Sequence, residues 1–255
     1  MSGADVSAAL QGRVGTVVLA RPPVNAMRTQ SYEDLRDALR TLQDDRACSV
    51  IVIRSGVPSI FSAGADVKEL PMPPEQDEAR QALTRGVFAQ VLHSPVPVIC
   101  AVDGPALGAG CQLACACDVR LATRAARFGV PEITVGRCGA GRFLMRVLPA
   151  GTVRQMYFTG TPIGAEQAHA LGMVSELLDG ADALHARAAE LAEEIAAKSP
   201  LAVRLAKQSL DLAEEMSLLE GYEVEQQFSL RLAGTPDAAE AAAAFREKRA
   251  PRWTS

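Results

Sequence analysis

The sequence lacks the features that several large classes of protein require. Its 255 residues carry 26 basic and 30 acidic side chains, a formal net charge of −4, so no excess of positive charge favours a nucleic-acid surface. No apolar run reaches the roughly 18 residues of a membrane-spanning helix. The N-terminal stretch MSGADVSAALQG has neither the basic nor the apolar region of a secretory signal. We therefore expect a cytoplasmic protein without membrane or nucleic-acid partners.

Histidine is scarce, and the cysteines do not form a metal-binding pattern. The three histidines lie in unrelated segments, at His93, His169 and His185. This argues against a histidine-centred triad, and no G-x-S-x-G motif is present. Cys111, Cys115 and Cys117 lie close together, but no second ligand pair follows them. Five of the six cysteines have apolar or small-residue surroundings, so we interpret them as buried small hydrophobic residues and predict no metal site.

Strands alternate with helices up to Pro149, and helices alone follow it. Nearly half of the residues are hydrophobic, enough for a sizeable core without disulfides. We predict an α/β core over residues 1–198 and a C-terminal helical region over 199–255, with the boundary at Ser199 and Pro200. The predicted strands are 14–19, 48–54, 96–102 and 118–122. The predicted helices begin at Ser31, as an N-cap, and then span 79–92, 111–117, 142–148, 153–158, 165–171, 181–198, 202–213, 218–232 and 237–248.

The stretch around which the chain is organised is Asp103–Gln112, DGPALGAGCQ. It follows the apolar run Val96–Val102 and holds three glycines, and a helix of small residues begins within or just after it. A strand, a glycine-rich turn and a helix start bring bare backbone N–H groups close to a ligand. Such a site holds either a phosphate or an oxygen that becomes negative during a reaction.

A second stretch repeats this pattern. Phe61–Leu70, FSAGADVKEL, is predicted to be a small-residue turn that leads into a helix, with Asp66 and Glu69 in the first turns, where acidic side chains suit the helix dipole. The next residues, Pro71–Gln76, are predicted to form an exposed loop. Two such turns in one chain are more informative than either alone.

Glu132 is a single acidic residue in an otherwise apolar run. It stands between Pro131 and Ile133. It is either a surface or N-cap carboxylate, or a carboxylate in an apolar pocket with a raised pKa, suited to proton transfer.

Three motifs in order carry a resemblance. FSAGADVKEL, DGPALGAGCQLACACD and FGVPEITVG, with RPPVNAM near the start and AFREKRAPRW at the end, resemble the enoyl-CoA hydratase/isomerase (crotonase) family. The resemblance covers nearly the whole chain. It implies a crotonase-like spiral of β-β-α units with a C-terminal helical region that drives formation of a homotrimer, often a dimer of trimers. It also implies a coenzyme A thioester as substrate and no separate cofactor.

The resemblance assigns roles to four residues. In the family, two backbone N–H groups hold the thioester oxygen as it becomes an enolate, and the matching positions are Ala65 and Ala109. Hydratases of the family carry two catalytic glutamates. The second is present as Glu132, whereas Gln112 stands in place of the first. Because an amide cannot accept a proton at neutral pH, Gln112 either orients a water or substrate, or caps a neighbouring backbone group.

The resemblance also indicates where coenzyme A lies. The matching positions are Asn25 and Ala26; Ala63, Asp66, Val67 and Lys68; and Phe245 and Lys248 near the C-terminus. The first six line the coenzyme A moiety mostly through their backbone. Phe245 and Lys248 meet the nucleotide, perhaps from a neighbouring subunit, although Lys248 also suits a solvated helix end.

Several functions remain open at this stage. With one carboxylate, the favoured reaction is isomerisation of the double bond of an enoyl-CoA. The alternatives are hydration of a 2-enoyl-CoA with Gln112 positioning the water, another reaction through an acyl-CoA enolate, and a non-catalytic acyl-CoA-binding homologue. A dinucleotide-binding turn is disfavoured, because the spacing G-x-x-x-G-x-G is wrong for it.

Overall fold

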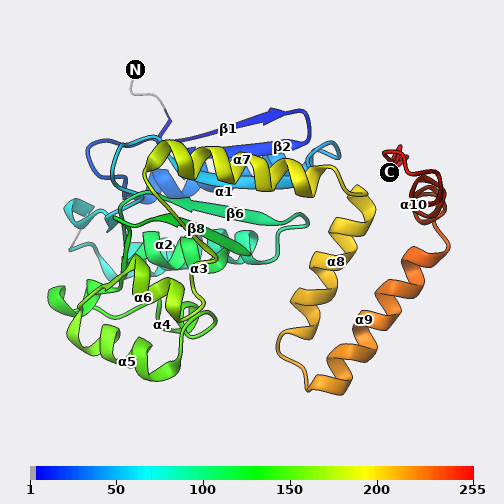
Figure 1. Ribbon diagram of the computed structural model, residues 1–255. Coiled ribbons are helices and arrows are strands. Elements are labelled where there is room, and N and C mark those ends of the chain that lie inside the picture. The colour runs from blue at the N-terminus through cyan, green and yellow to red at the C-terminus, as the bar shows by residue number, and fades with distance from the viewer. Residues whose placement is uncertain (1–3, 70) are drawn as a thin grey trace.

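A mixed six-stranded sheet forms the centre of the computed structural model, which describes residues 4–69 and 71–255 (Figure 1). Its strand order is β1-β2-β4-β6-β8-β11. The strands span Val6–Gln11, Val14–Leu19, Val50–Ser55, Val98–Val102, Val119–Thr123 and Glu176–Leu178, respectively. β1 and β2 are antiparallel, and each later neighbour pairs in parallel. Parallel strands need helical crossovers, so the sheet is covered on both faces.

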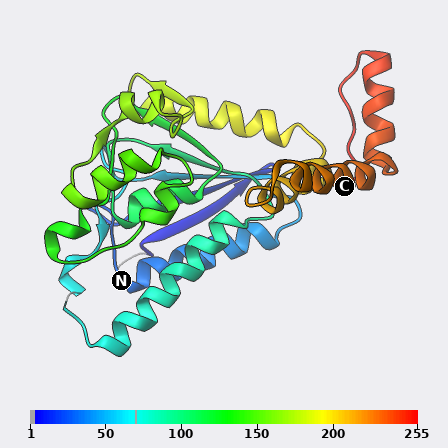
Figure 2. The same cartoon turned by 90° about the horizontal axis from the view of Figure 1, so that it is seen from below.

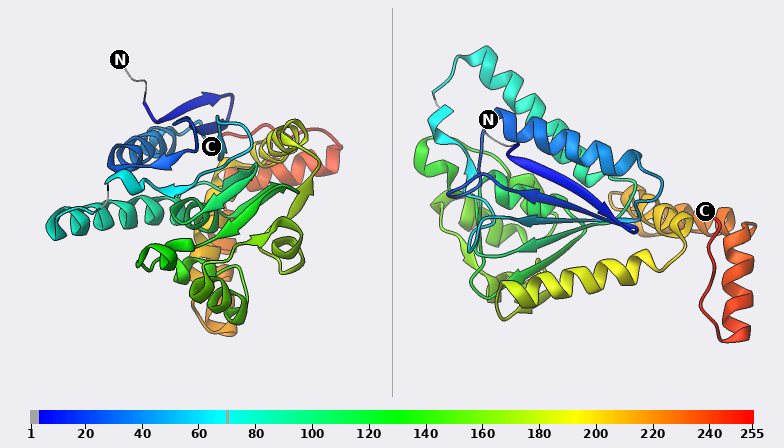
Figure 3. Two further views of the ribbon diagram at one scale, coloured as in Figure 1. Left: turned by 90° about the vertical axis from the view of Figure 1, so that its left-hand side faces the viewer. Right: turned by 90° about the horizontal axis from the view of Figure 1, so that it is seen from above.

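Alternation along the strands divides the core between the two faces. Val50 and Val52 pack with the buried side of α7 (Ala181–Ala196), whereas Ile51 and Ile53 belong to the larger cluster on the opposite face. That cluster lies under α1 (Thr29–Asp44), α2 (Pro74–Leu92) and α3 (Ala109–Ala116). Figure 2 and Figure 3 show the sheet between α7 on one side and α1 with α2 on the other.

Short strands follow the long ones and form two small sheets. β3 (Ala26–Met27) pairs with β5 (Gly64–Ala65), and β7 (Pro105–Leu107) pairs with β9 (Arg127–Gly129), which also pairs with β10 (Ile163–Gly164). An isolated bridge between Ser62 and Ala106 joins the two small sheets. A long strand, a short strand and a helix therefore recur along the chain, as predicted for β-β-α units.

The C-terminal helices leave the core as an arm. α8 (Pro200–Ala213), α9 (Leu218–Ala233) and α10 (Pro236–Glu247) lie to one side of the sheet in Figure 1. Ser199 caps α8, because its Oγ accepts a hydrogen bond from Ala202 N. The remaining helical segments are η1 (Val67–Glu69), η2 (Pro131–Val135), α4 (Gly141–Leu144), α5 (Ala150–Thr159) and α6 (Ala165–Ala170). Within the described ranges, no helix is both long and apolar enough to cross a bilayer.

Several predicted boundaries are wrong. Ser31 is not the N-cap of α1: Arg28 is, and Ser31 lies in the first turn, where its Oγ accepts from Arg28 N. The helix expected after Ala65 is only the short η1, and Leu70 lies outside the described residues. The helix predicted to start at 79 begins at Pro74, because proline at the first helical position costs no hydrogen bond.

The strands that sequence reasoning missed are short or weakly patterned. β3, β5, β7, β9, β10 and β11 have two or three residues each, too few to show an alternation. β1 is longer, but its Ser-Ala-Ala centre alternates weakly and is largely exposed. The helix predicted over 142–148 is cut to the single turn of α4.

Lys207 anchors the arm to the core, and its loss should destabilise the protein. Its side chain is almost fully buried, and Nζ donates to Leu92 O, Asp118 Oδ1 and Asp211 Oδ1, each at 2.9 Å. Lys207→Met leaves two carboxylates without their cation, so we expect a loss of about 3 kcal/mol in unfolding free energy, measured by urea denaturation. Lys198→Met, at an exposed position, is the control. An equal change in both variants would contradict this role.

Candidate active site

Glu132 and the start of α3 meet because β7 and β9 end side by side. Leu107 pairs with Gly129 at the ends of these parallel strands, and Gly108 N donates to Gly129 O at 2.8 Å. The chain after β7 turns directly into α3, and the chain after β9 turns into η2, which carries Glu132. The carboxyl ends of neighbouring parallel strands thus bring the glycine-rich turn and the acidic residue together.

Gly108 makes room for the Glu132 carboxylate. A Cβ atom at Gly108 would lie 2.7 Å from Glu132 Oε1, closer than van der Waals contact permits. Gly108 also has φ +52°, a conformation that disfavours side chains. The carboxylate therefore lies against the backbone immediately before Ala109, and only glycine fits between them.

Ala65 approaches the same turn through Gly64. A Cβ atom at Gly64, where φ is +90°, would lie 2.8 Å from Leu107 O and 3.3 Å from Ala109 N. This contact sets β5 directly against the first residue of α3. The structure therefore brings Ala65, Ala109 and Glu132 to one place.

The geometry leaves the Ala65 and Ala109 amides available to a ligand. Ala109 is the first residue of α3, so its N–H has no acceptor within the helix. Ala65 pairs with Met27, but the carbonyl of Met27 accepts from Asp66 N at 2.9 Å. In this parallel ladder the Ala65 N–H consequently points away from β3. Two such donors side by side can hold an oxygen that gains negative charge.

Glu132 is not a surface carboxylate. The residue is half-buried, and its Oε2 is fully buried without a hydrogen-bond partner in the part of the chain that the structure describes. Burial raises the pKa of the Glu132 carboxyl above its ordinary value. It does not cap η2 either, because the N-cap is Val130. A buried carboxyl with a raised pKa suits both taking up and returning a proton near neutral pH.

Gln112 lies on the same face of α3 as Gly108. Gln112 N donates to Gly108 O at 2.9 Å, one turn apart, and the side chain is half-buried. Side chains on a helix lean toward its N-terminus and over the residue four positions earlier. The Gln112 amide therefore lies on the side of α3 where Glu132 lies.

The segment predicted to line coenzyme A surrounds Ala65. Asn25 is buried, with φ +48°, and its side chain donates to Ser55 Oγ and Phe61 O and accepts from Arg21 N. Asn25 thus fixes the loop and offers no side-chain atom to a ligand. Its neighbour Ala26 belongs to β3, which holds β5 in register.

The other predicted residues of this segment differ in exposure. Ala63 N is engaged with Val24 O, and Asp66 pairs with Arg21 at 2.7 Å. Val67 and Lys68 are exposed beside them and are accessible to a ligand.

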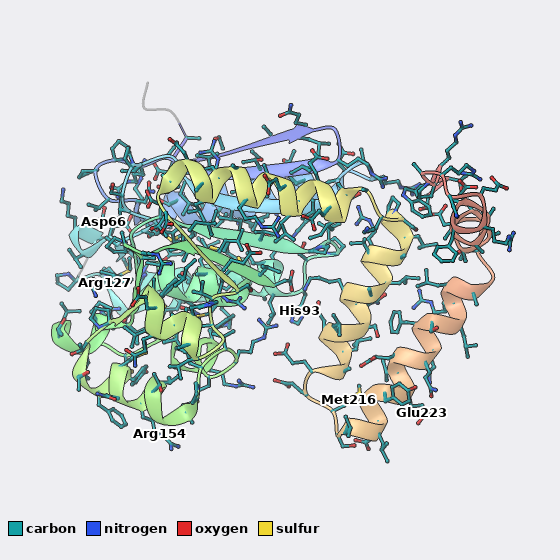
Figure 4. All side chains as sticks on the ribbon, viewed as in Figure 1. Asp66, His93, Arg127, Arg154, Met216 and Glu223 are labelled. Atoms are coloured by element: carbon teal, nitrogen blue, oxygen red, sulfur yellow. The ribbon has the colours of Figure 1, made fainter. Side chains whose placement is uncertain are left out.

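Phe245 and Lys248 do not approach this site within one chain. Both are exposed on or just after α10, at the far end of the arm (Figure 1). Figure 4 shows Asp66 and Arg127 at the end of the core opposite the arm, which carries Met216 and Glu223. A contact between α10 and coenzyme A therefore requires a second copy of the chain.

Sequence reasoning missed three charged residues near the site. Asp77 on α2 is shared by Arg80 and Arg137, and Arg137 N donates to Glu132 O at 2.9 Å. The available signal was Arg80, which stands in helical register with Thr84, Val87, Phe88 and Val91. A charged residue on the apolar stripe of a helix is buried for a reason.

The cysteines are five buried thiols and the exposed Cys138. Within residues 4–69 and 71–255, no cluster of histidine, cysteine and acidic side chains could hold a metal ion.

Comparison with known proteins gives one family throughout. The sequence profile of the enoyl-CoA hydratase/isomerase family matches residues 9–255. The enoyl-CoA hydratase domain-containing protein 2, mitochondrial, of Bos taurus is 37% identical over 251 residues, covering 94% of this chain and 84% of that protein. The methylglutaconyl-CoA hydratase, mitochondrial, of Mus musculus is 34% identical, covering 90% of this chain and 75% of that protein.

Solved structures agree with this result. The crystal structure of enoyl-CoA hydratase from Bacillus anthracis superposes with a TM-score of 0.93 at 31% sequence identity, covering 98% of both chains. The enoyl-CoA hydratase structure from Mycobacterium smegmatis gives a TM-score of 0.92 at 31% identity, covering 98% of this chain and 99% of that one. The predicted crotonase-like α/β fold is confirmed.

Proposed function

The chain is an acyl-CoA enzyme of the enoyl-CoA hydratase/isomerase family, and from this premise we propose that it moves the double bond of a 3-enoyl-CoA. Glu132 takes a proton from C2 of the acyl chain. The electron pair moves onto the thioester oxygen, which the amides of Ala65 and Ala109 hold as an enolate. The same carboxyl, now protonated, returns the proton at C4, and the double bond ends between C2 and C3.

One observation carries this proposal: a buried Glu132 carboxylate beside the amide pair, with Gln112 where a second carboxylate is expected. Oε1 of Glu132 lies against Gly108, and burial raises the pKa of that carboxyl. A 1,3-proton shift needs a single group that accepts and then donates a proton. Hydration needs a base for water and an acid for the α-carbon, and an amide can be neither at neutral pH.

A second candidate is hydration of a 2-enoyl-CoA. It is favoured by the names of relatives, which include a methylglutaconyl-CoA hydratase at 34% identity. In this case Gln112 orients a water by hydrogen bonds, and Glu132 serves as both base and acid.

Assays with crotonyl-CoA and 3-hexenoyl-CoA, run side by side on the same preparation, separate the two candidates. We expect kcat/KM for isomerisation of 3-hexenoyl-CoA to exceed that for hydration of crotonyl-CoA by at least about tenfold, because one placed acid–base group is worth roughly 10²–10⁴-fold in rate. A preference for crotonyl-CoA would favour the hydratase.

The variant Gln112→Glu should gain hydratase activity. It adds the missing carboxylate on the face of α3 beside Glu132, so we expect hydration of crotonyl-CoA to rise by at least about tenfold. Gln112→Ala, the matched control, should leave isomerisation within about threefold of the starting enzyme. Fast hydration by the unmodified enzyme that disappears in Gln112→Ala would show instead that Gln112 places the water.

We further propose a homotrimer, or a dimer of trimers, assembled through the arm. Large apolar side chains are exposed along it: Leu218, Leu219, Tyr222, Leu230 and Phe245. An apolar pocket of about 370 Å³ between α7 and α8 continues this surface. Contiguous apolar area of this kind favours association. Its test is mass by light scattering. The cytoplasmic location stays a prediction, since the relatives named above include proteins called mitochondrial.

A further inference from the structure

Arg80 is a buried cation with an unused donor. It lies on α2 in helical register with Val87, Phe88 and Val91, the residues that bury this helix. Its side chain is only 11% exposed. Among the described residues its Nε, which is fully buried, has no hydrogen-bond partner. A buried guanidinium N–H without an acceptor costs free energy, so an acceptor from outside the chain would relieve that cost.

The charges around Arg80 do not balance. Asp77 Oδ1 accepts from Arg80 Nη2 at 2.8 Å, and Asp77 Oδ2 accepts from Arg137 Nη1 at 2.9 Å. Two permanent cations therefore share one carboxylate. The hydrogen bonds from Arg80 and Arg137 hold the pKa of Asp77 below its ordinary value, so it is ionised near neutral pH. One positive charge is left over, which suits one additional carboxylate.

A short chain of contacts ties this cluster to Glu132. Arg137, the partner of Asp77, donates its backbone N–H to Glu132 O at 2.9 Å. The buried Tyr32 lies within electrostatic reach of both ends. Burial raises the pKa of Tyr32 to about 12, the charge of Arg80 opposes this rise, and the charge of Glu132 adds to it.

Arg80 and Glu132 do not pair with each other. Within the described residues, Nε of the one and Oε2 of the other both lack partners. Two opposite buried charges in hydrogen-bond range would have paired, so a separation remains between them. A substrate that reacts at Glu132 could reach Arg80 only with a group some carbons further along its acyl chain.

We infer that Arg80 binds a second carboxylate at the distal end of the acyl chain, so that the preferred substrates are CoA monoesters of dicarboxylic acids. The inference deepens the proposed function, because it places the acyl chain between Glu132 and α2. It concerns recognition rather than proton transfer, and binding measurements test it without any turnover.

The experiment compares two saturated five-carbon thioesters, glutaryl-CoA and pentanoyl-CoA, by isothermal titration calorimetry. They share the CoA moiety, so any difference reports the terminal carboxylate alone. We expect the unmodified protein to bind glutaryl-CoA about 100-fold more tightly, since a charge-assisted pair in a buried site is lost with pentanoyl-CoA. In Arg80→Met the two affinities should become equal within about threefold.

Controls keep the result interpretable. Arg85→Met, at an exposed position of the same helix, should keep the full preference. Arg137 still pairs with Asp77 in Arg80→Met, so the variant should fold, and its thermal unfolding is measured alongside. Should it not fold, Arg80→Lys, which keeps the charge but loses Nε–H, should retain only about a tenth of the preference.

Equal binding of both thioesters by the unmodified protein would overturn the inference, as would a preference that persists in Arg80→Met. Failure of the proposed isomerisation looks different: glutaryl-CoA would bind selectively through Arg80, while glutaconyl-CoA and 3-hexenoyl-CoA would not be isomerised.

Discussion

Replacing Glu132 with glutamine should lower kcat for 3-enoyl-CoA isomerisation by roughly 10³-fold. The amide keeps the size of the side chain but can neither accept the C2 proton nor return it at C4. Binding of a saturated acyl-CoA should stay within about threefold, because the amides of Ala65 and Ala109 are backbone donors that the substitution leaves in place. Steady-state kinetics and calorimetry with butyryl-CoA measure the two effects separately.

The pH profile carries a second signature of Glu132. Its pKa is raised by burial, so the acidic limb of kcat/KM should fall at a higher pH than an exposed glutamate would give. That limb should vanish from the residual activity of Glu132→Gln. Glu193→Gln, an exposed position on α7, should keep both the rate and the limb. Full activity in Glu132→Gln would mean that another group moves the proton.

The same substitution should make the protein more stable at neutral pH. A carboxyl whose pKa is raised on folding binds its proton more tightly in the folded state, so its ionisation destabilises the fold as pH rises through that raised value. Glu132→Gln removes this penalty and should add about 1 kcal/mol at pH 7 to 8. The gain should shrink as pH falls below the raised pKa. Urea denaturation at pH 5 and pH 8 tests this, and a gain that grows toward low pH would contradict it.

Gly108→Ala should lower kcat by roughly 10²–10³-fold, the cost of disturbing an oxyanion hole. The added methyl would lie 2.7 Å from Glu132 Oε1, so it must push the carboxylate away from the amide of Ala109. The positive φ of Gly108 adds backbone strain of about 1–2 kcal/mol, which should also lower the melting temperature. Kinetics and thermal unfolding of the purified variant measure both.

Gly139→Ala is the matched control for this change. Gly139 lies in the loop after η2, and a Cβ there would meet no atom within 4 Å. We expect wild-type kcat and a melting temperature within a degree or two. If Gly108→Ala retained full activity, the Glu132 carboxylate could not lie against Gly108 during catalysis.

The amino-acid sequence by itself determined the local features of this protein. Apolar runs such as Val98–Val102 and helices with a clear 3.6-residue repeat are encoded in neighbouring residues, so their type could be predicted. The glycine-rich turn at Gly108 and the unusual placement of Glu132 in an apolar run were visible for the same reason. The boundaries of α1 and α2 were not, because a residue such as Ser31 suits both a cap and a first turn.

Only the tertiary structure decided which of these features meet. Glu132 touches Gly108 because β7 and β9 pair in parallel, and Gly64 abuts Ala109 because two small sheets are bridged. It also showed that Asn25 is buried with its side chain engaged, that Phe245 is remote from Glu132 in its own chain, and that Arg80 is buried with a donor unused. Sequence patterns report the period of one element at a time. Contacts between elements depend on strand order and packing, which no local pattern encodes.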